Sequence, residues 1–195
     1  MSSLRIFIAE SVSAEGFYEG RVDGYAANEV LKIQGVSTIY RMILTRTLLD
    51  ASVREAGQQG CGLFHLSCHG NDDGIVLTDG TAIGWLEFAS LVLPIAVPGC
   101  SLVMSCCSGG YVGLSKALQK VGGTFDYISG STEAAGVGFT DSCLAWSILY
   151  SRIISRGLKP TDLRDTMNVI NNAVPGAFVF RKWNGSVYKS YPNYG

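Results

Sequence analysis

The sequence lacks an excess of charge of either sign. It carries 15 lysines and arginines against 16 acidic residues in 195 positions, and no lysine-rich or arginine-rich block occurs along it. Proteins that bind nucleic acid through its phosphates need a basic face or stripe. We therefore expect no nucleic-acid partner.

Long apolar runs are also missing. No stretch approaches the roughly 20 apolar residues of a membrane span, and the first residues, "MSSLRIFIAESVSAEG", have an arginine inside a short apolar run rather than a secretory pattern. We expect a cytoplasmic protein with no membrane contact. In a reducing compartment its six cysteines are expected to be buried small hydrophobes, metal ligands or catalytic thiols rather than disulfide partners.

What the sequence does have is an alternation of short apolar runs with longer stretches of helical spacing, without a repeat or linker. This alternation is typical of an α/β fold with a mostly parallel sheet, and we predict a single domain over residues 1–195. The predicted strands are 4–10, 62–68, 74–80, 101–105 and 125–129, and the predicted helices are 37–60, 84–92, 111–120, 140–156 and 161–173.

Two further structural predictions are specific. The helix over 37–60 is expected to begin at Ser37 or Thr38 and to bury Leu44, Leu48 and Ala51. At the end of the chain, two aromatic-rich runs flank "NG" at 184–185, which predicts a C-terminal β-hairpin.

The ends of two buried strands carry reactive side chains. "GLFHLSCHG" ends in His69 and Gly70, and "SLVMSCCSGG" runs into Cys106 and Cys107 before a turn of small residues. Ligands of open α/β sheets bind beyond the carboxyl ends of the strands. If these strands are neighbours, a histidine and a thiol meet there, which is what a cysteine nucleophile and its base require.

Alternation along a strand separates the two cysteines, because successive side chains point to opposite faces. Cys106 shares a face with Leu102 and Met104 and is expected to pack under a helix, whereas Cys107 lies where the strand breaks. On spacing alone, a nucleophilic Cys107 and a purely structural cysteine pair both remain open. His65, in mid-strand, is expected to be buried and hydrogen-bonded.

The segments "HLSCHG" and "LVMSCCSGG" resemble the two motif blocks of the caspase-like cysteine peptidases. Laid on the caspase form Q-A-C-[RQG]-G, Cys107 takes the nucleophile position. The resemblance is closest to CHAT domains, a bacterial caspase-like family whose blocks read H-x-x-x-H-G and S-A-C-x-[ST]-G. Here Cys106 replaces the Ala of the second block, and Gly109 replaces its Ser or Thr.

The resemblance implies a three-layer caspase-like fold and a cysteine endopeptidase that cleaves a protein substrate. Its catalytic dyad would be Cys107 and His69, and the backbone amides of Gly70 and Cys107 would bind the oxyanion. Such a mechanism needs no metal and no other cofactor. By the same resemblance, we expect a regulatory or activating protein partner in a bacterial immune or cell-death system.

Charged residues near the two blocks are candidates for substrate binding. Asp72, Asp73 and Asp126 could line a pocket for a basic side chain, although all three also fit solvated turn positions. Arg21, after the first strand, resembles one wall of the caspase pocket and would instead bind an acidic side chain. The glycine-rich segment 130–142 is expected to border the crevice as a mobile loop.

Two rival interpretations remain. The first is a metal site, whose possible ligands are His65, Cys68, His69, Cys106 and Cys107. Their spacing matches no C-x-x-C knuckle, and adjacent cysteines on opposite strand faces are poorly placed to hold one ion. The second is a catalytically inactive caspase-like scaffold that acts as a protein-interaction module through its C-terminal hairpin.

Overall fold

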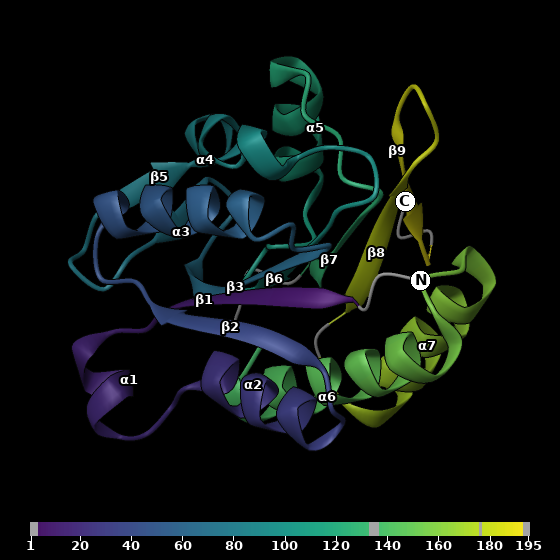
Figure 1. Ribbon diagram of the computed structural model, residues 1–195, viewed down its shortest axis with the longest axis horizontal. Coiled ribbons are helices and arrows are strands. Elements are labelled where there is room, and N and C mark those ends of the chain that lie inside the picture. The colour runs from purple at the N-terminus through teal and green to yellow at the C-terminus, as the bar shows by residue number, and fades with distance from the viewer. Residues whose placement is uncertain (1–3, 133–136, 176, 193–195) are drawn as a thin grey trace.

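The computed structural model describes residues 4–132, 137–175 and 177–192 (Figure 1). In chain order its elements are β1 (Arg5–Ser11), α1 (Ala14–Tyr18), α2 (Asp23–Ile33), β2 (Ser37–Met42), α3 (Arg46–Gln58), β3 (Leu63–Gly70), β4 (Gly74–Val76), β5 (Ala82–Gly84), α4 (Trp85–Leu91), β6 (Ser101–Ser105), α5 (Val112–Val121), β7 (Tyr127–Ser131), α6 (Phe139–Arg156), α7 (Pro160–Ala173), β8 (Phe178–Trp183) and β9 (Tyr188–Tyr191). Within these ranges, no helix combines the length and the hydropathy that a membrane span requires.

The main sheet has the strand order β2-β1-β3-β6-β7-β8-β9. The first five of these strands are parallel neighbours, and β8 and β9 continue the sheet in antiparallel pairing. The short strands β4 and β5 form an antiparallel extension at the end of β3. The predicted α/β fold with a mostly parallel sheet and a C-terminal hairpin is confirmed.

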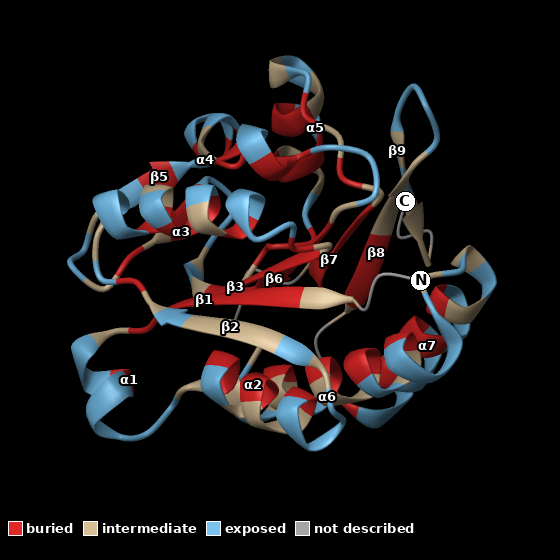
Figure 2. Ribbon diagram, in the orientation of Figure 1, coloured by how far each residue is buried: buried red, intermediate tan, exposed pale blue. Residues whose placement is uncertain are grey.

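Helices cover both faces of this sheet, which gives three layers (Figure 1). The core beneath α3, α4 and α5 takes Leu102 and Met104 from β6, whereas the core beneath α2, α6 and α7 takes Val103. Consecutive side chains of β6 pack into the cores on opposite faces of the sheet. All five residues of this strand are therefore buried, and Figure 2 shows the central strands largely in the colour for buried residues.

The prediction of one long helix over 37–60 is wrong, because the segment forms β2 followed by α3. Thr38, Ile39 and Tyr40 are β-branched or aromatic residues, which favour a strand, and they pair with β1. The helix begins only after Thr45, whose hydroxyl accepts a hydrogen bond from the Leu48 amide.

The buried side of α3 also differs from the prediction. The helix buries Leu49, Ser52, Val53 and Ala56. The predicted stripe of Leu44, Leu48 and Ala51 instead faces solvent, with Leu44 and Leu48 exposed by 45% and 43%. A helix does form over Arg46–Gln58, but the prediction of its buried residues is wrong.

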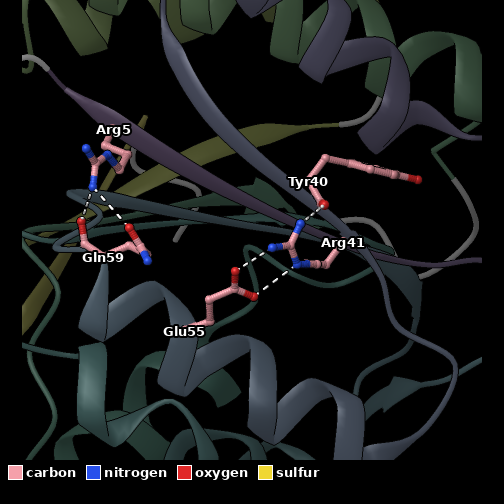
Figure 3. A network of polar contacts seen from close by, with 5 residues as sticks. All are labelled: Arg5, Tyr40, Arg41, Glu55 and Gln59. Atoms are coloured by element: carbon pink, nitrogen blue, oxygen red, sulfur yellow. Dashed lines mark hydrogen bonds and ion pairs between the residues drawn. The ribbon is translucent and has the colours of Figure 1, made fainter.

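Polar contacts tie α3 to the edge of the sheet (Figure 3). The Arg41 guanidinium on β2 donates to both carboxylate oxygens of Glu55, at 3.0 and 2.5 Å. Four residues further along, at the same C-terminal end of the helix, Arg5 on β1 donates to the backbone carbonyl of Gln59 at 2.7 Å. These surface contacts orient α3 over the sheet.

Helices α1 and α2 were not predicted. Helix α2 follows Val22, which offers no side-chain cap. Its first N–H groups are instead bound by the carboxylate of Glu10 on β1, which accepts from Gly24 at 2.8 Å and from Tyr25 at 2.9 Å. A cap supplied by another element leaves no local signal in the sequence.

Candidate active site

The two motif blocks lie on neighbouring strands. β3 and β6 pair in parallel with Ser67 opposite Ser105, so His69 and Cys107 both lie two positions further along, at the same edge of the sheet. A cavity of about 240 Å³ occupies this edge. Its lining comprises Asp23, Cys68, His69, Ser105, Cys106, Cys107, Val137, Gly138, Phe139 and Ser142.

The adjacent cysteines differ in environment. Cys106 is 8% exposed and packs in the same core as Leu102 and Met104, as predicted, whereas Cys107 is only partly buried. Both cysteines nevertheless border the cavity, so the alternation of side chains along the strand does not fully exclude Cys106 from the crevice. A hydrogen bond to Cys106, together with burial, raises the pKa of Cys68 well above its usual value. Cys68 therefore stays a thiol near neutral pH.

His69 is exposed at the mouth of the cavity, and its ring packs edge-on against Phe139 with 6.2 Å between the centroids. The pairing of β3 with β4 extends to Gly70, which lies opposite Ile75. A Cβ atom at position 70 would come within 2.6 Å of the Cys107 carbonyl oxygen. Glycine is therefore required here for the histidine segment to approach the cysteine segment.

The turn after Cys107 is equally tight. A Cβ atom at Gly109 would lie 2.6 Å from Cβ of Met104, and one at Gly110 would lie 2.5 Å from the Gly130 carbonyl oxygen. This packing explains why a glycine stands at 109, where the CHAT block has Ser or Thr. Helix α5 starts just beyond, at Val112, with its N-terminal dipole directed towards this turn.

His65 has the structural role that the sequence indicated. It is completely buried between aromatic rings of α6, and its Nδ1 is hydrogen-bonded to the Tyr150 hydroxyl at 2.5 Å. Burial lowers the pKa of His65 to about 3. It is a neutral core residue and does not line the cavity.

Asp23, the first residue of α2, was not among the predicted site residues. Its carboxylate lines the cavity and accepts hydrogen bonds from Ser67, at 2.5 Å, and from Ser105. The Trp146 indole N–H in turn donates to the Ser105 hydroxyl at 2.6 Å. Burial raises the pKa of Asp23, and the serine hydroxyls oppose that rise. The signal that could have identified it is an acid at the start of a helix, in "RVDGYAANEV".

Similarity to known proteins is found in the fold. No family model matches the chain, and no curated protein matches it in sequence. Among solved structures it is similar to the complex of the pro- and mature domains of Porphyromonas gingivalis RgpB, a gingipain, with a TM-score of 0.53 and 12% identity. The similarity covers 87% of this chain and 43% of the other, so the chain spans less than half of that protein's length.

The fold is caspase-like. At 12% identity the similarity shows the fold alone. It supports the general caspase-like resemblance read from the sequence and does not single out the CHAT family.

The caspase-like fold separates the four predicted substrate-binding residues. Asp126 precedes β7, where its backbone pairs with Cys100 and Trp183, and this is the opposite end of the strands from the cavity. The structure therefore does not bring Asp126 to the crevice. Arg21 lies in a second hollow, of about 330 Å³, which shares Asp23 and Phe139 with the first. Its exposed guanidinium pairs with Glu19.

Asp72 and Asp73 follow His69, outside the residues that line the cavity. The Asp72 carboxylate accepts a hydrogen bond from the Ser108 hydroxyl at 2.7 Å. Asp73 is exposed, and its backbone carbonyl accepts from the Trp85 amide at 3.0 Å. These contacts tie the segment after His69 to neighbouring parts of the chain.

The glycine-rich segment 130–142 does border the cavity, through Val137, Gly138, Phe139 and Ser142. The predicted loop is shorter than 130–142, because residues 130–131 belong to β7 and residues 139–142 to α6. Residues 133–136 lie outside the described part of the chain. For the rival metal interpretation, no group of three or more potential ligands gathers within the described ranges.

Proposed function

We propose that this protein is a cysteine endopeptidase in which Cys107 is the nucleophile and His69 is the general acid and base. The observation that carries the proposal is that both side chains line one cavity, at the shared edge of two paired strands. A partly buried thiol beside an exposed imidazole is the pairing that thiol nucleophiles use.

In the proposed reaction, the Cys107 sulfur attacks the scissile carbonyl carbon while His69 accepts the thiol proton. His69 then gives that proton to the leaving amine, and the peptide C–N bond breaks to leave a thioester on Cys107. Water, deprotonated by His69, hydrolyses the thioester and restores the thiol. His69 thus returns each proton that it accepts, first to the leaving amine and then to the Cys107 sulfur.

The oxyanion would be bound by the backbone amides of Gly70 and Cys107. Support comes from the close approach of Gly70 to the Cys107 backbone, which only glycine permits. The start of α5 beyond Cys107 adds a favourable dipole for developing negative charge.

The cavity favours a basic substrate side chain before the scissile bond. Asp23 is a buried carboxylate in the lining, and no lysine or arginine is among the described lining residues. The Asp23 carboxylate has two hydroxyl donors but no counter-charge among these residues, and an arginine or lysine of the substrate would supply one. Arg21, the candidate for binding an acidic side chain, has Glu19 as its partner.

We further propose, from the motif resemblance, a CHAT-type peptidase that depends on an activating protein partner in a bacterial immune or cell-death system. The alternative is an inactive caspase-like scaffold that binds partners. The two differ in one measurable property, which is whether Cys107 reacts with a peptide-like electrophile.

The test combines a fluorogenic peptide library with an arginyl acyloxymethyl ketone probe. We expect cleavage after basic residues and labelling of Cys107 as identified by mass spectrometry. Cys107→Ala and His69→Ala should abolish both, whereas the matched variant Cys106→Ala should retain them. Labelling that moves to Cys106, or that persists in Cys107→Ala, would reject the assignment of the nucleophile. If the probe does not label Cys107 in the wild type, the inactive scaffold is favoured.

A further inference from the structure

One side-chain hydrogen bond connects the two segments that carry the proposed dyad. Ser108, directly after Cys107, donates its hydroxyl to Oδ1 of Asp72, three residues after His69, with 2.7 Å between the oxygens. The bond joins positions 36 apart in sequence. It therefore links the turn that holds Cys107 to the turn that follows His69.

Ser108 has an unusual backbone. Its φ of +57° lies in the left-handed region, which a residue with a side chain seldom adopts. The residue is also completely buried, so its hydroxyl has no exposed surface. Without Asp72 the hydroxyl would be a buried donor without that partner, in a backbone conformation that already costs energy. The bond thus stabilises a strained turn next to the nucleophile.

Trp85 holds the other end of this bond in place. Its indole N–H donates to the Asp72 carbonyl at 2.8 Å, and its backbone amide donates to the Asp73 carbonyl. The same indole packs against the first turn of α5, where a Cβ atom at Gly113 would lie 3.0 Å from the ring. Asp72 is therefore fixed by a buried tryptophan that also contacts the helix following Cys107.

We propose that Asp72 is a positioning residue, which acts through Ser108 to hold the Cys107 thiol beside His69. The inference rests on the proposed peptidase function and assigns to Asp72 a role within the site rather than contact with substrate. Asp72 lies outside the residues that line the cavity, which agrees with an indirect role.

Three roles of Asp72 can be separated by measuring how fast iodoacetamide alkylates Cys107 at pH 7. If Asp72 positions the thiol, Asp72→Asn and Ser108→Ala should each slow alkylation by about tenfold, because small displacements in a site are costly. If Asp72 acted only by its charge, Asp72→Asn should speed alkylation, because removal of a nearby negative charge favours the thiolate. If Asp72 bound substrate, neither variant should change alkylation.

Peptide cleavage supplies the second measurement. We expect kcat to fall about tenfold in both variants with KM unchanged, and the double variant to be no slower than either single variant, because one bond is removed in each case. Asp50→Asn and Ser90→Ala are matched controls on the surface of α3 and α4, and both should behave like the wild type. An increase in KM confined to Asp72→Asn would overturn the proposal.

Ser108→Gly is a second variant for the case that Ser108→Ala fails to fold, because glycine adopts a positive φ freely. If strain alone mattered, Ser108→Gly would react like the wild type, which would contradict a role for the hydrogen bond. If the bond positions the thiol, it should be slow like Ser108→Ala. Should the wild type cleave no peptide, the peptidase function would fail, while the alkylation rates of Cys107 would still decide the role of Asp72.

Discussion

The Ser67 hydroxyl on β3 donates to the Asp23 carboxylate at the start of α2, with 2.5 Å between the oxygens. Ser105, its neighbour in register on β6, donates to the other carboxylate oxygen. Each strand thus contributes a hydroxyl two positions before a residue of the proposed dyad. The same pair of strands positions His69 and Cys107 and, through the two serine hydroxyls, the Asp23 carboxylate that lines the same cavity.

This arrangement makes Asp23 the proposed determinant of substrate charge. Asp23→Asn retains the shape of the side chain but removes its charge. We expect kcat/KM to fall by about a hundredfold for peptides with arginine before the scissile bond, since a charge pair loses one member. Peptides with leucine there should change little. An equal loss for both substrates would show that Asp23 supports the fold rather than the choice of substrate.

Glu10 is predicted to be essential for the position of Asp23. Its buried carboxylate accepts from Gly24, Tyr25 and the Tyr40 hydroxyl, so it caps the helix that Asp23 begins. In Glu10→Gln, an NH₂ donor replaces one of the acceptor oxygens and faces groups that also donate. We expect the free energy of unfolding to fall by about 1–3 kcal/mol.

Urea denaturation measures the effect of Glu10→Gln, and Glu55→Gln is the matched control. Glu55 pairs with Arg41 on the surface, and its replacement should cost at most about 1 kcal/mol. Equal losses for the two variants would contradict the capping role of Glu10.

The placement of His69 and Cys107 at one edge of the sheet could be predicted, because most of its signals are local. The strands that lead to His69 and Cys107 are short runs rich in apolar residues, and neighbouring parallel strands end at the same edge of a sheet. Alternation also predicted correctly that Cys106 packs with Leu102 and Met104. Each of these inferences needed only neighbouring residues and the geometry of a strand.

What could not be predicted depends on contacts between distant residues. Helix α2 is capped by Glu10 from another element, so its only local signal is the acidic first residue, Asp23, and both the helix and Asp23 were missed. The Ser108 bond to Asp72 likewise joins separate segments. In the prediction for 37–60, helical spacing was given more weight than the strand preference of Ile39 and Tyr40. The pairing with β1 that makes these residues a strand cannot be read from the segment itself.

Gly109 offers a test of the packing beneath the nucleophile. In Gly109→Ala, the new Cβ atom would meet Cβ of Met104 at 2.6 Å and the Cys106 sulfur at 2.9 Å, so the turn must shift. We expect a loss of about 1–3 kcal/mol in the free energy of unfolding, together with reduced alkylation of Cys107. Gly57→Ala is the control, because its Cβ atom would make ordinary contact in α3 and should stabilise by about 0.5–1 kcal/mol. Identical effects of the two changes would refute this account of the packing.

His65 predicts a dependence of stability on pH. Burial lowers its pKa to about 3 in the folded protein, whereas an unfolded histidine titrates near 6.5, at about its ordinary value. Between these values the unfolded chain binds a proton that the folded protein does not, so the free energy of unfolding falls as the pH falls. The contribution of His65 is therefore fully present above about pH 6.5 and is lost progressively towards pH 3.

His65→Gln removes this proton uptake and leaves the other titrating groups as they are. The difference in free energy of unfolding between the wild type and this variant should shrink, or reverse in sign, as the pH falls from 7 to 4, at a slope approaching about 1.4 kcal/mol per pH unit. Urea denaturation at several pH values measures it. A difference that stays constant over this range would mean that His65 is protonated in the folded protein, which its burial against Trp146 and Tyr150 opposes.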